Sequence, residues 1–104
     1  MAIINPQQQQ SIHRNFSLVV DYLESKFRKS PIHLLEVPNY MYQGNKSKLE
    51  ITVYSNPRIA KVDVKIIGLK DYDREPAYAC TYDLNGLSIN VFQREIDNLI
   101  SRMD

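Results

Sequence analysis

The chain has one cysteine, three glycines and no tryptophan. A single cysteine cannot form an internal disulfide, and no cluster of cysteine and histidine is spaced to hold zinc. Three glycines are too few to build a glycine-rich phosphate loop. We therefore exclude a disulfide scaffold, a zinc module and a P-loop nucleotide-binding protein, and we expect no metal and no cofactor.

Long apolar runs are also missing, because the longest contain only three or four residues. A membrane-spanning helix needs about 20. The N-terminal segment "MAIINPQQQQ" lacks the apolar centre of a signal peptide. We predict a cytoplasmic protein without a membrane-spanning segment.

The remaining composition is that of a globular protein. The 104 residues are 43% hydrophobic and 24% charged, which suits one domain over residues 1–104 with a single core.

Two segments have helical patterns. Asn5 and Pro6 suit the cap and first position of a helix, and Gln8 could complete a capping box. Pro31 is expected to stop this helix, and Glu24 is spaced to pair with Arg28. Its apolar stripe consists of Ile12, Phe16, Val19, Val20, Leu23 and Phe27. After the Asn85-Gly86 turn, Ser88 or Asn90 caps a last helix with core positions Phe92, Ile96, Leu99, Ile100 and Met103.

Strand-like runs occupy residues 32–37, 48–54, 59–67 and 77–83, the first of them ambiguous in its faces. A two-residue turn at Gly44-Asn45 predicts Tyr40 opposite Leu49. A four-residue loop at 55–58 predicts Val53 opposite Ala60 and Glu50 opposite Asp63, the latter a mildly destabilising pair. The middle strands alternate between an apolar and a charged face.

This order predicts an α+β fold of two layers. It consists of an N-terminal helix, an antiparallel meander of three to four strands and a C-terminal helix. Both helices pack on one sheet face, and the other face meets water.

No catalytic constellation is visible. His13 and His33 have no histidine spaced to join either one, and Cys80 lies mid-strand without a local basic group to lower its pKa. We therefore predict that the protein is not an enzyme.

Charge is distributed unevenly along the chain. Residues 28–61 contain six basic and two acidic residues, whereas residues 71–104 contain three basic and seven acidic residues. The chain either presents separate basic and acidic regions or interleaves them on folding. We predict a small protein-interaction module of the regulator, adaptor, chaperone or inhibitor type. The predicted contact residues are Tyr40, Met41, Tyr42, Gln43, Lys46, Lys48, Arg58 and Lys61.

Nucleic-acid binding by the basic region 28–61 is the alternative. The order helix, three strands, helix resembles the double-stranded RNA-binding domain, which implies such binding. That family starts its second helix with a glycine- and lysine-rich phosphate clamp, whereas residues 85–104 are acidic here.

Self-association is a further prediction. Ile67 on the outer sheet face and the edge of the strand at 77–83 could pair two copies in a homodimer. The opposite expectation is a monomer in which the loop at 68–76 covers that edge.

Overall fold

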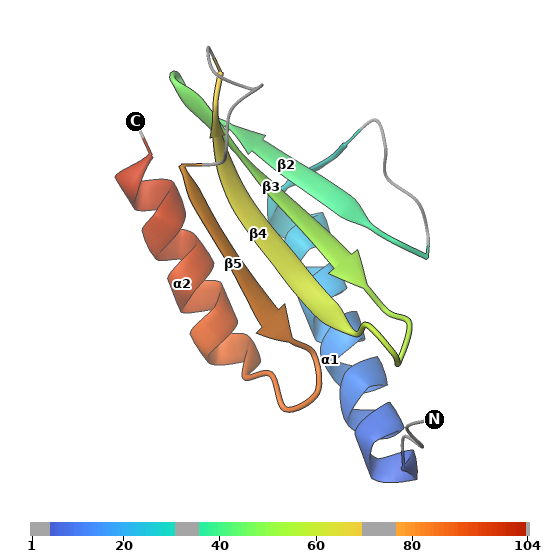
Figure 1. The fold of residues 1–104 in the computed structure, drawn as a ribbon. Helices are drawn as coiled ribbons and strands as arrows, with labels where there is room; N and C mark the ends of the chain where they lie inside the picture. Colours follow the sequence, from blue (N-terminus) through green and yellow to red (C-terminus); the bar gives the residue numbers. More distant parts are fainter. Residues whose placement is uncertain (1–4, 31–35, 70–76, 104) are drawn as a thin grey trace.

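The computed structural model describes residues 5–30, 36–69 and 77–103. In chain order the elements are α1 (Pro6–Lys26), β1 (Arg28–Lys29), β2 (Asn39–Gln43), β3 (Ser47–Tyr54), β4 (Lys61–Gly68), β5 (Tyr78–Asp83) and α2 (Ile89–Arg102) (Figure 1). The predicted α+β order is confirmed, with five strands in place of three to four. Of the strand expected at 32–37, residues 32–35 lie outside the described part, and residues 36–37 are not in a strand, since β2 begins at Asn39.

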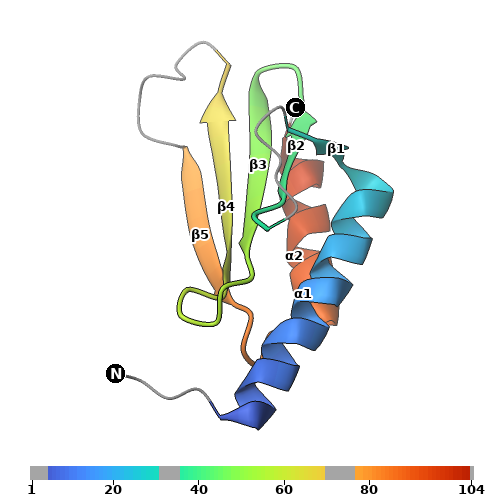
Figure 2. The ribbon, with the colours of Figure 1, turned by 90° about the vertical axis from the view of Figure 1, so that its right-hand side faces the viewer.

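The five strands form one antiparallel sheet in the order β1-β2-β3-β4-β5. Both helices lie on the same face of this sheet, as Figure 2 shows edge-on. The predicted two-layer arrangement is therefore confirmed. We call the face away from the helices the open face.

Helix α1 begins with the predicted capping box. The Gln8 backbone N–H donates to Asn5 Oδ1 at 2.8 Å, and the Asn5 N–H donates to Gln8 Oε1 at 3.2 Å. The helix ends at Lys26, before Pro31, because the next residues enter β1. Arg28 is thus outside the helix and the expected pair with Glu24 is wrong, since an i,i+4 contact requires both residues to be helical.

Both hairpins differ from the predicted register by two residues. Tyr40 lies opposite Ile51 and not Leu49, and Val53 lies opposite Val62 and not Ala60. In the first hairpin, Gly44 N–H donates to the carbonyl of Ser47 at 2.8 Å, so the turn is at residues 45–46. A shift of two keeps every side chain on its predicted face, because strand side chains alternate with period two.

The shift in the second hairpin changes the surroundings of Glu50. Glu50 lies opposite Lys65, and Asp63 lies opposite Thr52, so the predicted like-charge pair does not form. Glu50 Oε1 is 3.0 Å from Lys48 Nζ, and its Oε2 is 3.5 Å from Lys65 Nζ. The longer loop therefore exchanges a repulsive cross-strand pair for an attractive one.

The core lies between the helices and the apolar sheet face. Its buried residues are Ile12, Val19, Leu23, Phe27, Tyr40, Leu49, Ile51, Val53, Val62, Val64, Leu84, Phe92 and Ile96. Ser88 is the cap of α2, and its hydroxyl accepts the backbone N–H of Val91 at 3.4 Å. The predicted α2 positions Leu99, Ile100 and Met103 pack against this core partly buried.

A polar contact joins the two helices at their outer surface. Asp97 Oδ1 accepts hydrogen bonds from Lys26 Nζ and from the hydroxyl of Tyr22, the latter at 2.8 Å. These donors, with Lys26 the largest influence, lower the pKa of Asp97 below its ordinary value. The carboxylate form is therefore favoured in the folded state.

Acid is expected to weaken this contact. Because the pKa of Asp97 is lower in the folded than in the unfolded chain, its stabilisation is complete above about pH 4. It is lost as the pH falls through the folded-state pKa. Urea unfolding of the wild type and Asp97→Asn should differ at pH 7, and the difference should shrink towards pH 3. A difference that is independent of pH would contradict the assignment.

Candidate functional site

The predicted contact residues divide into two groups at opposite ends of the sheet. One group surrounds the β2–β3 hairpin and contains Tyr40, Met41, Tyr42, Gln43, Lys46 and Lys48. The other group lies at the far end of β3: Arg58 is in the β3–β4 loop, and Lys61 is the first residue of β4, opposite Tyr54. The sequence had placed all eight in one basic region, which the fold separates along the length of β3 (Figure 1).

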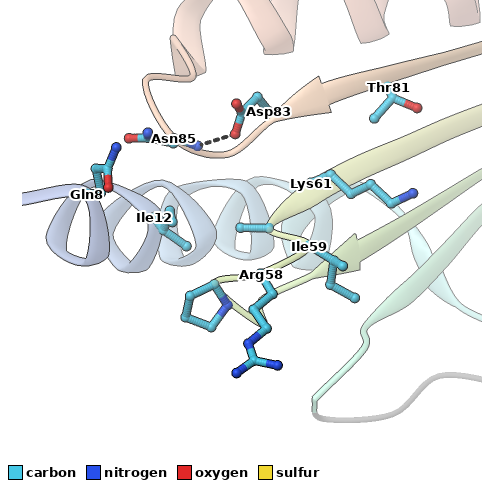
Figure 3. A pocket seen from close by; sticks show the side chains of 10 residues that line it. Gln8, Ile12, Arg58, Ile59, Lys61, Thr81, Asp83 and Asn85 are labelled. Atoms are coloured by element: carbon cyan, nitrogen blue, oxygen red, sulfur yellow. Dashed lines mark hydrogen bonds between the residues drawn. The ribbon is translucent and has the colours of Figure 1, made fainter. Parts of the chain in front are cut away.

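The far group borders an open hollow of about 530 Å³ between the N-terminal part of α1 and the β3–β4 loop. Figure 3 shows the charged ends of Arg58 and Lys61 pointing in different directions. Lys61 Nζ lies 5.2 Å from the centre of the Tyr54 ring and 3.4 Å from Asp63 Oδ2. The two cations therefore do not converge on one ligand position.

Tyr40 has no exposed surface, so it cannot contact a partner in the folded protein. Its hydroxyl donates to Glu24 Oε1 at 2.8 Å. Burial, followed by this hydrogen bond, raises the pKa of Tyr40 above its ordinary value. Tyr40 thus fixes β2 to α1 from inside the core and is left out of the site.

The two hairpin lysines have different surroundings. Lys46 lies at the turn and is exposed, whereas Lys48 lies half-buried on the open face, where Glu50 binds it. Glu50 also binds Lys65, and Asp63 binds Lys61. The three lysines of β3 and β4 therefore share two carboxylates, and each of them is engaged in an ion pair.

A basic concave surface lies where α1, β1 and β2 meet. This corner groove has a volume of about 760 Å³ and is lined by Lys26, Phe27, Arg28, Lys29, Met41, Tyr42, Gln43 and Gly44. Three of these were predicted contact residues: Met41, Tyr42 and Gln43. The groove brings them together with three cations from the end of α1 and the start of β1.

The apolar part of the corner groove is held by the core. Phe27 is buried, and its ring meets that of Tyr42 edge-to-face, with centroids 6.3 Å apart and planes at 86°. Tyr42 keeps 38% of its surface exposed. A fixed aromatic wall of this kind can receive an apolar side chain without losing its own order.

The cations of the groove differ in how firmly they are held. Asp97 binds Lys26, and Glu24 Oε1 lies 3.6 Å from Lys29 Nζ. Arg28 is exposed, and it forms no ion pair within the described residues. Neither carboxylate lines the groove, so its walls carry positive charge only.

Sequence reasoning missed the part of the site contributed by residues 26–29. The run "KFRK" places three cations around one aromatic residue and was the available signal. Periodicity assigns it to the end of an amphipathic helix, in which these side chains would point in different directions. The turn into β1 instead carries them to one corner.

Groups of three or more potential metal-ligating side chains are absent from the described residues. Within the same residues, no helix is long and apolar enough to cross a membrane. Comparisons with protein-family models, curated proteins and solved structures found no match.

Proposed function

We propose that this protein is a non-catalytic, cytoplasmic interaction module that binds another protein through the corner groove. The observation that carries the proposal is the joining of an aromatic wall, exposed at Tyr42, to three cations with no carboxylate in the lining. Aromatic residues, methionine and arginine are enriched in the cores of protein interfaces. Phe27, Tyr42, Met41 and Arg28 provide this combination.

The open face supports the choice of the groove. Its lysines on β3 and β4 form ion pairs, with Glu50 on β3 or with Asp63 on β4. A partner docking there would have to displace existing ion pairs, whereas the groove offers Arg28 without such a cost. The contact surface is therefore at the corner of the sheet.

Charge reversal of Arg28 should reduce partner capture. In a quantitative pull-down from an extract of the native host, we expect Arg28→Glu to lose at least about 90% of the proteins that the wild type enriches. That loss corresponds to roughly 1.4 kcal/mol, a size typical of an interfacial arginine. Arg94→Glu, an equal change at an exposed position of α2, is the matched control. Equal capture by both variants would refute the groove as the contact surface.

Nucleic-acid binding by the basic region 28–61 remains the alternative function, favoured by the exposed Lys46 next to the corner groove. If it is right, the protein should shift an oligonucleotide in a gel at low salt, and the shift should fade as salt is added. Lys46→Glu combined with Lys48→Glu should abolish the shift. Absence of any shift at low salt would end this alternative.

Pairing of two copies in a homodimer is a separate prediction. β5 is an edge strand of the sheet, and helix α2 runs alongside it (Figure 1). Light scattering should give twice the chain mass of 12.1 kDa for a homodimer. The mass of one chain at high concentration would remove the prediction.

A further inference from the structure

We propose that the corner groove binds an acidic segment of the partner in extended conformation, which adds as a short strand beside β2 at Gln43. The inference rests on the proposed function and specifies its partner class. Its support comes from the backbone of β2, the charges of the lining and the limited extent of the basic surface.

The backbone of Gln43 points into the groove. Strands β1 and β2 pair Arg28 with Met41, and the Ser30 N–H donates to the Asn39 carbonyl at 2.9 Å. Alternate residues of an antiparallel strand direct their backbone groups to the same side. Since Asn39 and Met41 face β1, the N–H and C=O of Gln43 face the same edge.

No described residue pairs with Gln43 on that edge. β1 begins at Arg28, and the preceding residues belong to α1 and its cap, Phe27. The chain therefore enters the sheet only at Arg28, and it does not form a strand at the position opposite Gln43. The corner groove is the unfilled continuation of β1, bounded at one end by Phe27.

The side chains of a strand in this position would alternate between the open face and the helix face of the sheet. Side chains on the open face would lie near Arg28, which shares that face with Met41 and Gln43. Side chains on the helix face would lie near Phe27 and Tyr42. The expected pattern is therefore alternation of acidic and apolar residues, with the carboxylates towards Arg28.

The extent of the basic surface favours a peptide over a nucleic acid. A polynucleotide is held by a basic track that follows its backbone. Here the lysines of β3 and β4 beyond Lys46 are bound to Glu50 or Asp63, so within the described residues the track of cations without an ion pair extends no further than Lys46. A peptide also supplies the N–H and C=O that Gln43 requires, as in other cases of strand addition.

The experiment uses the full chain and the peptide acetyl-Glu-Leu-Glu-Leu-Glu-amide, titrated by two-dimensional amide NMR. The chemical-shift change of the Gln43 backbone amide should be among the largest in the protein. Binding should weaken with added salt. Arg28→Glu should weaken binding about tenfold, whereas Arg94→Glu should not change it.

Two substitutions at Gln43 separate the backbone from the side chain. Gln43→Pro removes the N–H that faces the groove and keeps the β2–β3 hydrogen bonds, which that N–H does not join. It should weaken binding about tenfold, and Gln43→Ala should cause a clearly smaller loss. Unchanged thermal unfolding of each variant by circular dichroism confirms that it is folded. Equal binding by the two variants would overturn strand addition.

The remaining outcomes also decide between the proposals. Tighter binding of a ten-nucleotide oligothymidine than of the peptide, at the same residues, would overturn the peptide class. If the peptide fails to bind while Arg28→Glu still loses the captured proteins, the acidic-strand inference is wrong and the proposed function stands. If capture is also unaffected by Arg28→Glu, the proposed function falls as well.

Discussion

Replacement of Phe92 with alanine is expected to lower the free energy of unfolding by about 3–5 kcal/mol. Phe92 has no exposed surface. Its ring packs edge-to-face against the rings of Tyr82 and Tyr22, with centroid distances of 5.1 Å and 6.1 Å. Phe92 therefore joins α2 to both β5 and α1. Truncation removes the apolar contacts and leaves a cavity among groups that cannot close it fully.

Urea unfolding followed by circular dichroism measures this loss. Phe16→Ala is the matched control, because Phe16 packs against the same core but is only partly buried. The control should lose clearly less stability. A loss below about 1 kcal/mol for Phe92→Ala would contradict its place at the centre of the core. Because the free energy of unfolding of small domains is only about 5–15 kcal/mol in total, the variant should also unfold at a much lower urea concentration.

Replacement of Asn15 with leucine should lower the free energy of unfolding by about 1–3 kcal/mol. Asn15 is only 4% exposed. Its Nδ2 donates to the backbone carbonyl of Leu84 at 2.7 Å, which ties α1 to the segment between β5 and α2. Leucine has similar volume but no donor, so the buried Leu84 carbonyl would keep only the longer hydrogen bond from the Leu87 N–H, at 3.4 Å.

An exposed asparagine in α2 provides the control for this experiment. Asn98→Leu makes the same chemical change where the side chain meets water, and we expect little or no loss of stability. Asn15→Asp should be destabilising as well, because a carboxylate cannot donate to the carbonyl. Equal stabilities of Asn15→Leu and the wild type would show that the hydrogen bond from the Leu87 N–H alone satisfies the Leu84 carbonyl.

These two side chains show the limits of sequence reasoning within the core. Phe92 was recognised from its helical spacing, because an apolar residue at a periodic position has few alternatives to burial. Asn15 gave no such signal, since an asparagine in a helix is usually exposed. Its partner is 69 positions away, and only the packed structure brings them together.

The hairpins show a similar division. Alternation of apolar and charged residues predicted which face each side chain occupies, and the structure agrees for Tyr42, Leu49 and Val62. The same alternation could not separate registers that differ by two residues, because these place identical faces together. The turn hydrogen bond from Gly44 to Ser47 and the attraction between Glu50 and Lys65 accompany the register found.

The sequence by itself determined the order of an N-terminal helix, an antiparallel meander and a C-terminal helix, the buried face of the helices and middle strands, and the sidedness of the sheet. These follow from local periodicity, caps and turns, which act between neighbours in the chain. Only the tertiary structure decided the strand register, the early end of α1 at Lys26 and the corner where "KFRK" meets β2. These features depend on contacts between residues distant in sequence, whose energies no local pattern reports.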